Sequence, residues 1–130
     1  MASLDPTYTC PPGANDTSYG LHATLVVQNR TSSAVLIQSV TAELTLESVS
    51  GPWLEKVGDR YEAGNIAFTP AAAAAGADTS VAITIPSACT NGKSASTTPS
   101  HGDYSVKFVM TTSAGVSTVT SRDRHRIATT

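Results

Sequence analysis

Three histidines are the side chains of this sequence best suited to transfer a proton near neutral pH: His22, His101 and His125. His101 stands two residues before Asp103, a spacing at which an imidazole and a carboxylate could chelate a metal ion. A structural metal site usually takes about four ligands, so the fold would have to bring Asp123 or His125 to this pair. Because two ligands are too few for a site, we expect no bound metal and no other cofactor. His101 and Asp103 are the only candidate metal ligands.

The sequence contains no Gly-x-Ser-x-Gly elbow and no phosphate-binding loop. Its acidic residues are scattered over expected loops and outward strand faces, which does not predict the paired carboxylates of a glycosidase. We therefore expect a protein that is not an enzyme. A small hydrolytic or metal-dependent enzyme that uses His101, Asp103 and His125 is the third alternative.

An arginine-rich segment near the end of the chain contains Arg122, Arg124 and Arg126. In a strand these three side chains would share one face, because side chains alternate between faces. Such a ladder of guanidinium groups could bind carboxylates or sulfates in a bidentate manner. The alternative interpretation is that charges on an edge strand prevent sheets from aggregating.

Trp53, the single tryptophan, follows Gly51-Pro52 and is close in sequence to Tyr61. Flat aromatic rings stack on sugar rings, so this pair could form a platform for a glycan. The opposite interpretation is that Trp53 covers one end of a hydrophobic core, since a lone tryptophan in a sandwich is usually buried.

Two cysteines, Cys10 and Cys89, are the only thiols, and their spacing matches no zinc motif. Both stand in turn-like surroundings, where a bridge would attach residues 1–18 to the rest of the domain. We expect a disulfide between them rather than two buried free thiols, and a disulfide implies an oxidising, extracytoplasmic compartment.

Length and composition describe one domain that spans residues 1–130, because 130 residues are enough for a single core. Hydrophobic residues make up 40% of the chain and charged residues 14%, with a formal net charge of −2. A chain without a clustered basic surface is not expected to bind nucleic acid. No apolar run approaches the roughly 20 residues that span a bilayer, so we expect no membrane span.

Alternation of apolar and polar residues predicts strands along most of the chain. The inward-facing positions are Leu21, Ala23, Leu25 and Val27, then Leu36, Val40, Ala42, Leu44 and Leu46, then Val81, Ile83 and Ile85, and finally Tyr104, Val106, Phe108 and Met110. We expect Pro86 to end its strand, 71–75 to be a turn or one helical turn, 90–102 to be a loop, and 116–127 to be one final strand. The pattern predicts an all-β fold, an antiparallel two-sheet sandwich of about seven strands.

Gly102-Asp103-Tyr104-Ser105-Val106-Lys107-Phe108, followed by a hairpin at Gly115, resembles the last two strands of immunoglobulin-like and fibronectin-III-like modules of secreted bacterial proteins. The segment from Phe68-Thr69-Pro70 to Ile85 looks like an earlier strand of the same modules. The resemblance implies an immunoglobulin-like sandwich in which Tyr104 takes the place of the tyrosine corner. It does not select a function, because such modules serve many roles.

These observations predict a non-catalytic structural or interaction module of a secreted or cell-surface protein. Its partner would be a protein or a glycan at the cell surface. The alternative is a carbohydrate-binding module that uses Trp53 and Tyr61.

Overall fold

The computed structural model describes residues 2–10, 17–51, 53, 55–64, 66–89 and 100–129. Within these ranges the secondary structure consists of strands, and no helix is long and apolar enough to cross a membrane. The strands are β1 (Ala2–Leu4), β2 (Thr7–Thr9), β3 (Thr17–Gln28), β4 (Val35–Ser50), β5 (Arg60–Ala63), β6 (Ala67–Thr69), β7 (Ala72–Ala73), β8 (Asp78–Cys89), β9 (Ser100–Thr112), β10 (Gly115–Thr120) and β11 (His125–Thr129).

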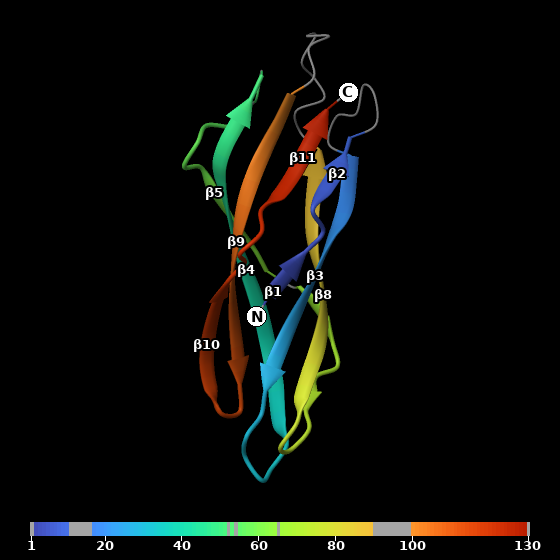
Figure 1. The fold of residues 1–130 in the computed structure, drawn as a ribbon, viewed down its shortest axis with the longest axis vertical. Coiled ribbons are helices and arrows are strands. Elements are labelled where there is room, and N and C mark those ends of the chain that lie inside the picture. The colour runs from blue at the N-terminus through green and yellow to red at the C-terminus, as the bar shows by residue number, and fades with distance from the viewer. Residues whose placement is uncertain are drawn as a thin grey trace.

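The strands form two sheets that pack face to face (Figure 1). The first sheet has the order β1-β3-β8-β6, and the second has the order β2-β11-β9-β4-β5. The short strand β7 pairs with β4, and β10 pairs with β9 on the same side as β11. All pairings are antiparallel except that of β2 with β11, which is parallel.

This strand order is that of an immunoglobulin-like sandwich. When the strands are lettered along the chain, β1, β3, β8 and β6 form the A-B-E-D sheet, and β10 with β11, β9, β4 and β5 form the G-F-C-C′ sheet. The expected all-β, antiparallel, two-sheet sandwich is therefore confirmed. The N-terminal segment crosses from one sheet to the other, since β1 pairs with β3 and β2 pairs with β11.

The core lies between the sheets and is built from the inward positions of the four longest strands. Leu21, Leu44, Val106 and Phe108 are all at most 1% exposed, as their alternation predicts. Leu36 differs from the expectation, because its side chain is 57% exposed. The β4–β9 register shifts between Ile37 and Ser39, so a bulge reverses the alternation there and turns Ile37 rather than Leu36 inward.

The expectation that Pro86 ends its strand is wrong, since β8 continues to Cys89. The amide of His22 donates to the Asp5 carboxylate, and its carbonyl accepts from the Asp5 amide, so its backbone groups point toward β1. The backbone N–H and C=O groups of even-numbered residues of β3 therefore point toward β1, and those of odd-numbered residues point toward β8. Pro86 is opposite Gly20, and its missing N–H therefore faces away from β3. On that side β6 reaches only to Thr84, so no ladder hydrogen bond between described strands is lost.

Two connecting segments also differ from the expectation. The alanine-rich run contains the short strand β7, which pairs Ala73 with Val35, and it has no helical turn. β9 begins at Ser100, so the last part of the expected loop 90–102 is strand, and residues 90–99 lie outside the described residues.

Candidate functional site

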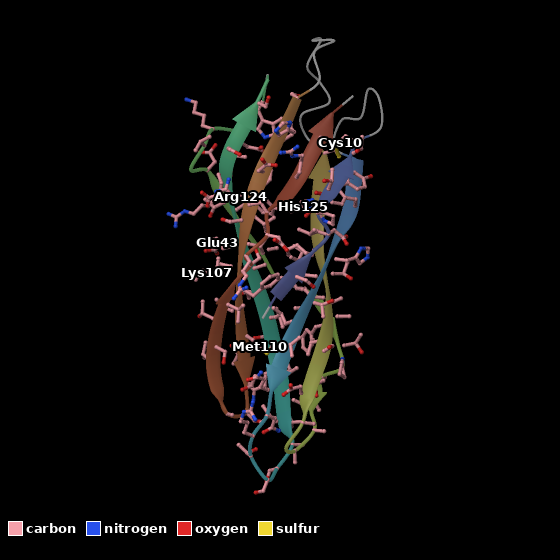
Figure 2. The ribbon with its side chains drawn as sticks, in the orientation of Figure 1. Cys10, Glu43, Lys107, Met110, Arg124 and His125 are labelled. Carbon is pink, nitrogen blue, oxygen red and sulfur yellow. A yellow bond between two sulfur atoms is a disulfide. The ribbon has the colours of Figure 1, made fainter. Side chains whose placement is uncertain are left out.

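The two cysteines form the expected disulfide, Cys10–Cys89. Cys10 directly follows β2 and its amide donates to the carbonyl of Ala128 at 2.8 Å, while Cys89 ends β8. The bond therefore joins the two sheets near the upper end of the molecule, where Cys10 is labelled in Figure 2. It attaches the N-terminal segment to the body of the sandwich.

His125 is fully buried, and both of its ring nitrogens have partners. Its Nδ1 lies 2.7 Å from the carbonyl oxygen of Asp5, and its Nε2 lies 2.8 Å from Oη of Tyr19. A carbonyl can only accept, so Nδ1 carries the proton and Nε2 accepts from the tyrosine hydroxyl. Burial lowers the pKa of His125, although the neighbouring Asp5 opposes this shift. Tyr19 in turn stacks on Tyr8 with ring centroids 3.8 Å apart.

Asp103 forms a bidentate ion pair with Arg126 on the outer face of the second sheet, with distances of 2.8 Å and 3.2 Å. The hydrogen bond from Arg126 is the main cause that lowers the pKa of Asp103. His125 and Asp103 belong to adjacent register pairs of β11 and β9 and so point to opposite faces. His101 and Asp103 share one face of β9, whereas His125 points to the other, so the fold does not bring all three together. No group of three potential metal ligands occurs within the described ranges.

The expected single final strand is interrupted, because β10 ends at Thr120 and β11 begins at His125. Between them Ser121 is buried; its hydroxyl accepts from the amide of Val106 at 3.3 Å and donates to the carbonyl of Asp123 at 2.9 Å. Arg122 and Arg124 therefore lie exposed in a bend, and Arg126 alone lies in a strand. The three arginines do not form a ladder along one strand.

Trp53 is partly buried and packs against β9 rather than standing free. Its Nε1 donates to Oε2 of Glu55 at 3.0 Å and to Oη of Tyr104 at 3.1 Å. A Cβ added to Gly102 would come within 2.8 Å of the indole ring, so the ring approaches the backbone of β9 as closely as only a glycine allows. The tryptophan is thus neither a fully buried core residue nor a free platform.

Tyr104 is 3% exposed and donates from Oη to Oε2 of Glu55 at 2.6 Å. Burial is the largest cause that raises its pKa, and the bond to Glu55 adds to this effect. A tyrosine corner would instead bond the backbone a few residues upstream. The resemblance therefore pointed to this tyrosine, but it did not predict that the hydroxyl bonds Glu55.

A cleft of about 500 Å³ opens beside these residues, between the end of β8 and the second sheet. Tyr61, Tyr104 and Tyr19 line it together with Glu55 and Ser87. Tyr61 is 40% exposed, and its hydroxyl lies 3.2 Å from Oγ of Ser87 across the cleft. Burial raises the pKa of Tyr61. The cleft offers aromatic surface with a carboxylate and hydroxyl groups at its sides.

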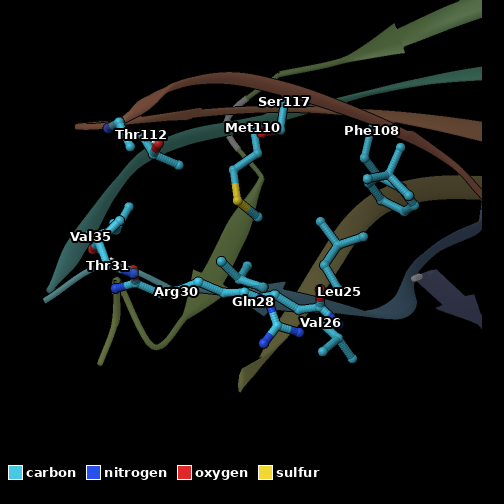
Figure 3. Close-up of a pocket in the computed structure, with 14 residues that line it drawn as sticks. Leu25, Val26, Gln28, Arg30, Thr31, Val35, Phe108, Met110, Thr112 and Ser117 are labelled. Carbon is cyan, nitrogen blue, oxygen red and sulfur yellow. Dashed lines mark hydrogen bonds between the residues drawn. The ribbon is translucent and has the colours of Figure 1, made fainter. Parts of the chain in front are cut away.

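A second opening of about 400 Å³ lies between β3 and β10 at the other end of the sandwich (Figure 3). Met110 points from β9 across this opening toward β3, and Phe108 and Leu25 point toward each other. We call this opening the lateral groove; its lining residues used below are Leu25, Arg30, Phe108, Met110, Ser117 and Val119.

Comparison with known proteins shows no matching family model and no matching curated protein. Among solved structures, the chain is similar to AggA, the major subunit of aggregative adherence fimbriae type I from Escherichia coli, with a TM-score of 0.41 and 12% identity over 100% of this chain and 93% of that one. It is also similar to a PapD-like domain of human CEP192, with a TM-score of 0.32 and 12% identity over 98% of this chain and 82% of that one. Because both TM-scores are low, the fold is assigned from the strand order described above and not from these two structures.

The sequence pattern did not point to Glu55, to Tyr19 or to the lateral groove. Glu55 stands in an irregular segment without a recognisable motif, and Tyr19 precedes the alternating run of β3. No residue pattern signals the groove, because its lining comes from several strands and Ser117 is an exposed polar residue between Val116 and Thr118.

Proposed function

We propose that this chain is a non-catalytic structural or interaction module of an extracytoplasmic protein. The observation that carries the proposal is the use of its most reactive groups in structural contacts. His125 is buried with both ring nitrogens bonded, and Asp103 is paired with Arg126. A proton-transfer catalyst would instead need such groups within reach of a substrate.

The disulfide and the composition support the extracytoplasmic setting. Disulfides such as Cys10–Cys89 persist in oxidising compartments. A surface rich in hydroxyl groups, with 14% charged residues, is typical of extracellular β proteins. The two long antiparallel pairs, β3 with β8 and β4 with β9, give an elongated body suited to carrying contacts at its edges (Figure 1).

Photo-crosslinking in the extracytoplasmic fraction of source cells tests this proposal. The folded domain should give a discrete crosslinked product, and a reduced and alkylated sample should not. His101→Ala should crosslink like the native chain, because the proposal gives His101 no chemical role. Turnover in a panel of hydrolase substrates that is lost in His101→Ala would overturn the proposal.

A second candidate function is glycan binding, which the cleft beside Tyr61 favours. An exposed tyrosine face can stack on a sugar, while Glu55 and Ser87 can accept or donate hydrogen bonds at the sides. Trp53 adjoins this cleft through its bonds to Glu55 and Tyr104, so its fluorescence reports on occupancy.

Titration with a panel of soluble oligosaccharides, followed by the emission of Trp53, tests this second function. A binding sugar should shift the emission of the native chain and of Val57→Ala, whose side chain is 62% exposed and does not line the cleft. Tyr61→Ala should lose the shift. If no sugar moves the emission, or if Tyr61→Ala responds like the native chain, the cleft is not a glycan site.

A further inference from the structure

The lateral groove lies on the side of the sandwich where the N-terminal strands cross between the sheets. At the upper part of this side, β1 covers the edge of β3 at Ala23–Leu25 and β2 covers the edge of β11. Below that point no described strand pairs with the β1-side edge of β3 beyond Leu25, whose other edge stays paired with β8, or with the outer edge of β10. Among the described strands, β1 and β2 therefore cover the seam between the sheets at one end only (Figure 1), and the lateral groove opens at the other end.

The backbone of β10 presents to this seam hydrogen-bonding groups that no described strand pairs with. The amide of Ser121, just after β10, donates to the carbonyl of Val106, which is opposite it in the register. The backbone N–H and C=O groups of odd-numbered residues of β10 therefore point toward β9. The N–H and C=O groups of Val116, Thr118 and Thr120 then point outward along the groove. The strand contains none of the lysines, prolines or inward charges that protect an edge from pairing.

Apolar side chains form the floor of the groove. Phe108 and Met110 come from β9, Leu25 comes from β3 and Val119 comes from β10 (Figure 3). Val116, on the outer face of β10, is 67% exposed. A free strand edge beside an apolar groove meets the two requirements of strand addition, in which the main chain supplies affinity and alternate side chains supply specificity.

The charges along the groove restrict the occupant. Arg30 lines one end of it, is exposed, and forms no ion pair with a described side chain. The segment Gly115–Thr120 carries no charge. The complementary ligand is therefore uncharged along most of its length and acidic where it reaches Arg30.

We propose that the lateral groove binds an extended segment of a partner protein. This segment pairs with the outer edge of β10, in line with the position that β2 occupies beside β11. Alternate apolar side chains of the segment, β-branched ones above all, enter the groove. An acidic residue at one end pairs with Arg30. This inference rests on the proposed function and names the surface and the partner chemistry through which the module acts.

Thr118→Pro is the decisive variant, because it removes an outward N–H without removing a hydrogen bond to β9. Proline is tolerated at edge positions whose N–H faces solvent, so the domain should fold. Thr118→Ala is the matched control, since it truncates the same side chain and keeps the N–H. Circular dichroism and the urea midpoint establish that both variants are folded.

The probe is a synthetic peptide of alternating valine and threonine with one terminal aspartate, and binding is followed by amide resonances and by calorimetry. The peptide should perturb the amides of Val116, Thr118 and Thr120 in the native chain and in Thr118→Ala. Thr118→Pro should weaken binding about tenfold, because the outward N–H that would pair with the peptide is lost and the peptide carbonyl opposite it is left without a donor. A peptide with a terminal lysine should bind less tightly, and Arg30→Ala should remove that difference.

Three outcomes overturn the inference. The first is that the aspartate peptide does not bind the native chain at millimolar concentration. The second is equal binding by Thr118→Pro and Thr118→Ala. The third is a dimer in sedimentation equilibrium that Thr118→Pro dissociates, which would assign the groove to a second copy. The first two outcomes would leave the proposed function intact if the domain still crosslinks to a partner in the extracytoplasmic fraction, and would remove only this surface from it.

Discussion

At the scale of single residues, the side chains best suited to acid–base chemistry stabilise the fold. His125 connects the N-terminal segment to the sandwich, because its two ring nitrogens contact the carbonyl of Asp5 and the hydroxyl of Tyr19. Gly102 has an equally specific task, since the absence of a side chain lets the ring of Trp53 lie against β9. Neither role can be recognised from residue type alone.

The burial of His125 predicts a dependence of stability on pH. Its pKa in the folded state lies below the ordinary value of 6.5, so the unfolded chain binds the proton more readily. The contribution of His125 to the free energy of unfolding is complete above pH 6.5 and decreases as the pH falls toward its folded pKa. Urea unfolding measured at several pH values should show this decrease.

His22→Gln, which changes an exposed histidine, is the control and should keep the slope, whereas His125→Gln should reduce it. Because His125→Gln could unfold the domain, a proton NMR titration of the native imidazole gives a second readout. A midpoint at or above 6.5 for His125 would contradict the prediction.

Gly102→Ala should displace Trp53, because the new methyl group would lie 2.8 Å from the indole ring. We expect a loss of about 1 to 3 kcal/mol in the free energy of unfolding, as for other substitutions that overpack a filled site. The emission of Trp53 should also move to the red. Gly64→Ala is the control, since nothing lies within 4 Å of a Cβ placed there; similar losses in the two variants would show that the ring does not pack as described.

At the scale of elements, strand ends and turns depend on side chains that the alternation pattern does not describe. The connection between β3 and β4 is organised by Asn29, which is 4% exposed. Its Nδ2 donates to the carbonyls of Ser33 at 2.8 Å and Ala73 at 3.1 Å, and its Oδ1 accepts from the amide of Thr31 at 3.0 Å. One side chain thus joins this turn to β7.

Asn29→Asp should destabilise the domain while preserving the shape of the side chain. A carboxylate would place an oxygen against the carbonyls of Ser33 and Ala73, where the native amide donates two hydrogen bonds. The expected cost is about 1 to 3 kcal/mol in the free energy of unfolding, measured with urea at neutral pH. Gln38→Glu, at an exposed position of β4, is the control. An unchanged midpoint in Asn29→Asp would show that this amide does not hold the turn.

At the scale of the whole molecule, the disulfide and the strand order determine how the two sheets are held together. Cys10 and Cys89 are separated by 79 positions in sequence, so the bond closes a long loop of the unfolded chain. The N-terminal segment adds β1 to one sheet and β2 to the other. Together these features close one end of the sandwich and leave the lateral groove at the other.

Replacement of both cysteines, Cys10→Ser with Cys89→Ser, should lower the free energy of unfolding by up to about 4 to 5 kcal/mol. The native chain should unfold at a lower urea concentration when a reductant is present, and the double variant should not respond to the reductant. Equal midpoints for the oxidised native chain and the double variant would show that the bond contributes nothing to stability.

Alternation along the chain was enough to predict the fold class and most of the core, because burying one face of a strand requires an apolar residue at every second position. The same local information predicted the cysteine pair, since turn-like surroundings and the lack of a metal motif left few alternatives. It failed at the bulge beside Ile37, at Pro86 and at the break near Ser121. At these places the outcome depends on which neighbouring strand receives each backbone group.

The candidate sites were decided by the tertiary structure alone. Trp53 and Tyr61 were both singled out from the sequence, and Glu55 is their neighbour in the chain, but Tyr104 and Tyr19 complete their surroundings from distant parts of the chain. The groove exists because β1 and β2 cover only part of an edge, which no residue pattern records. Sequence determines which face of each strand is buried; only the packing of the two sheets determines which edges remain free to bind.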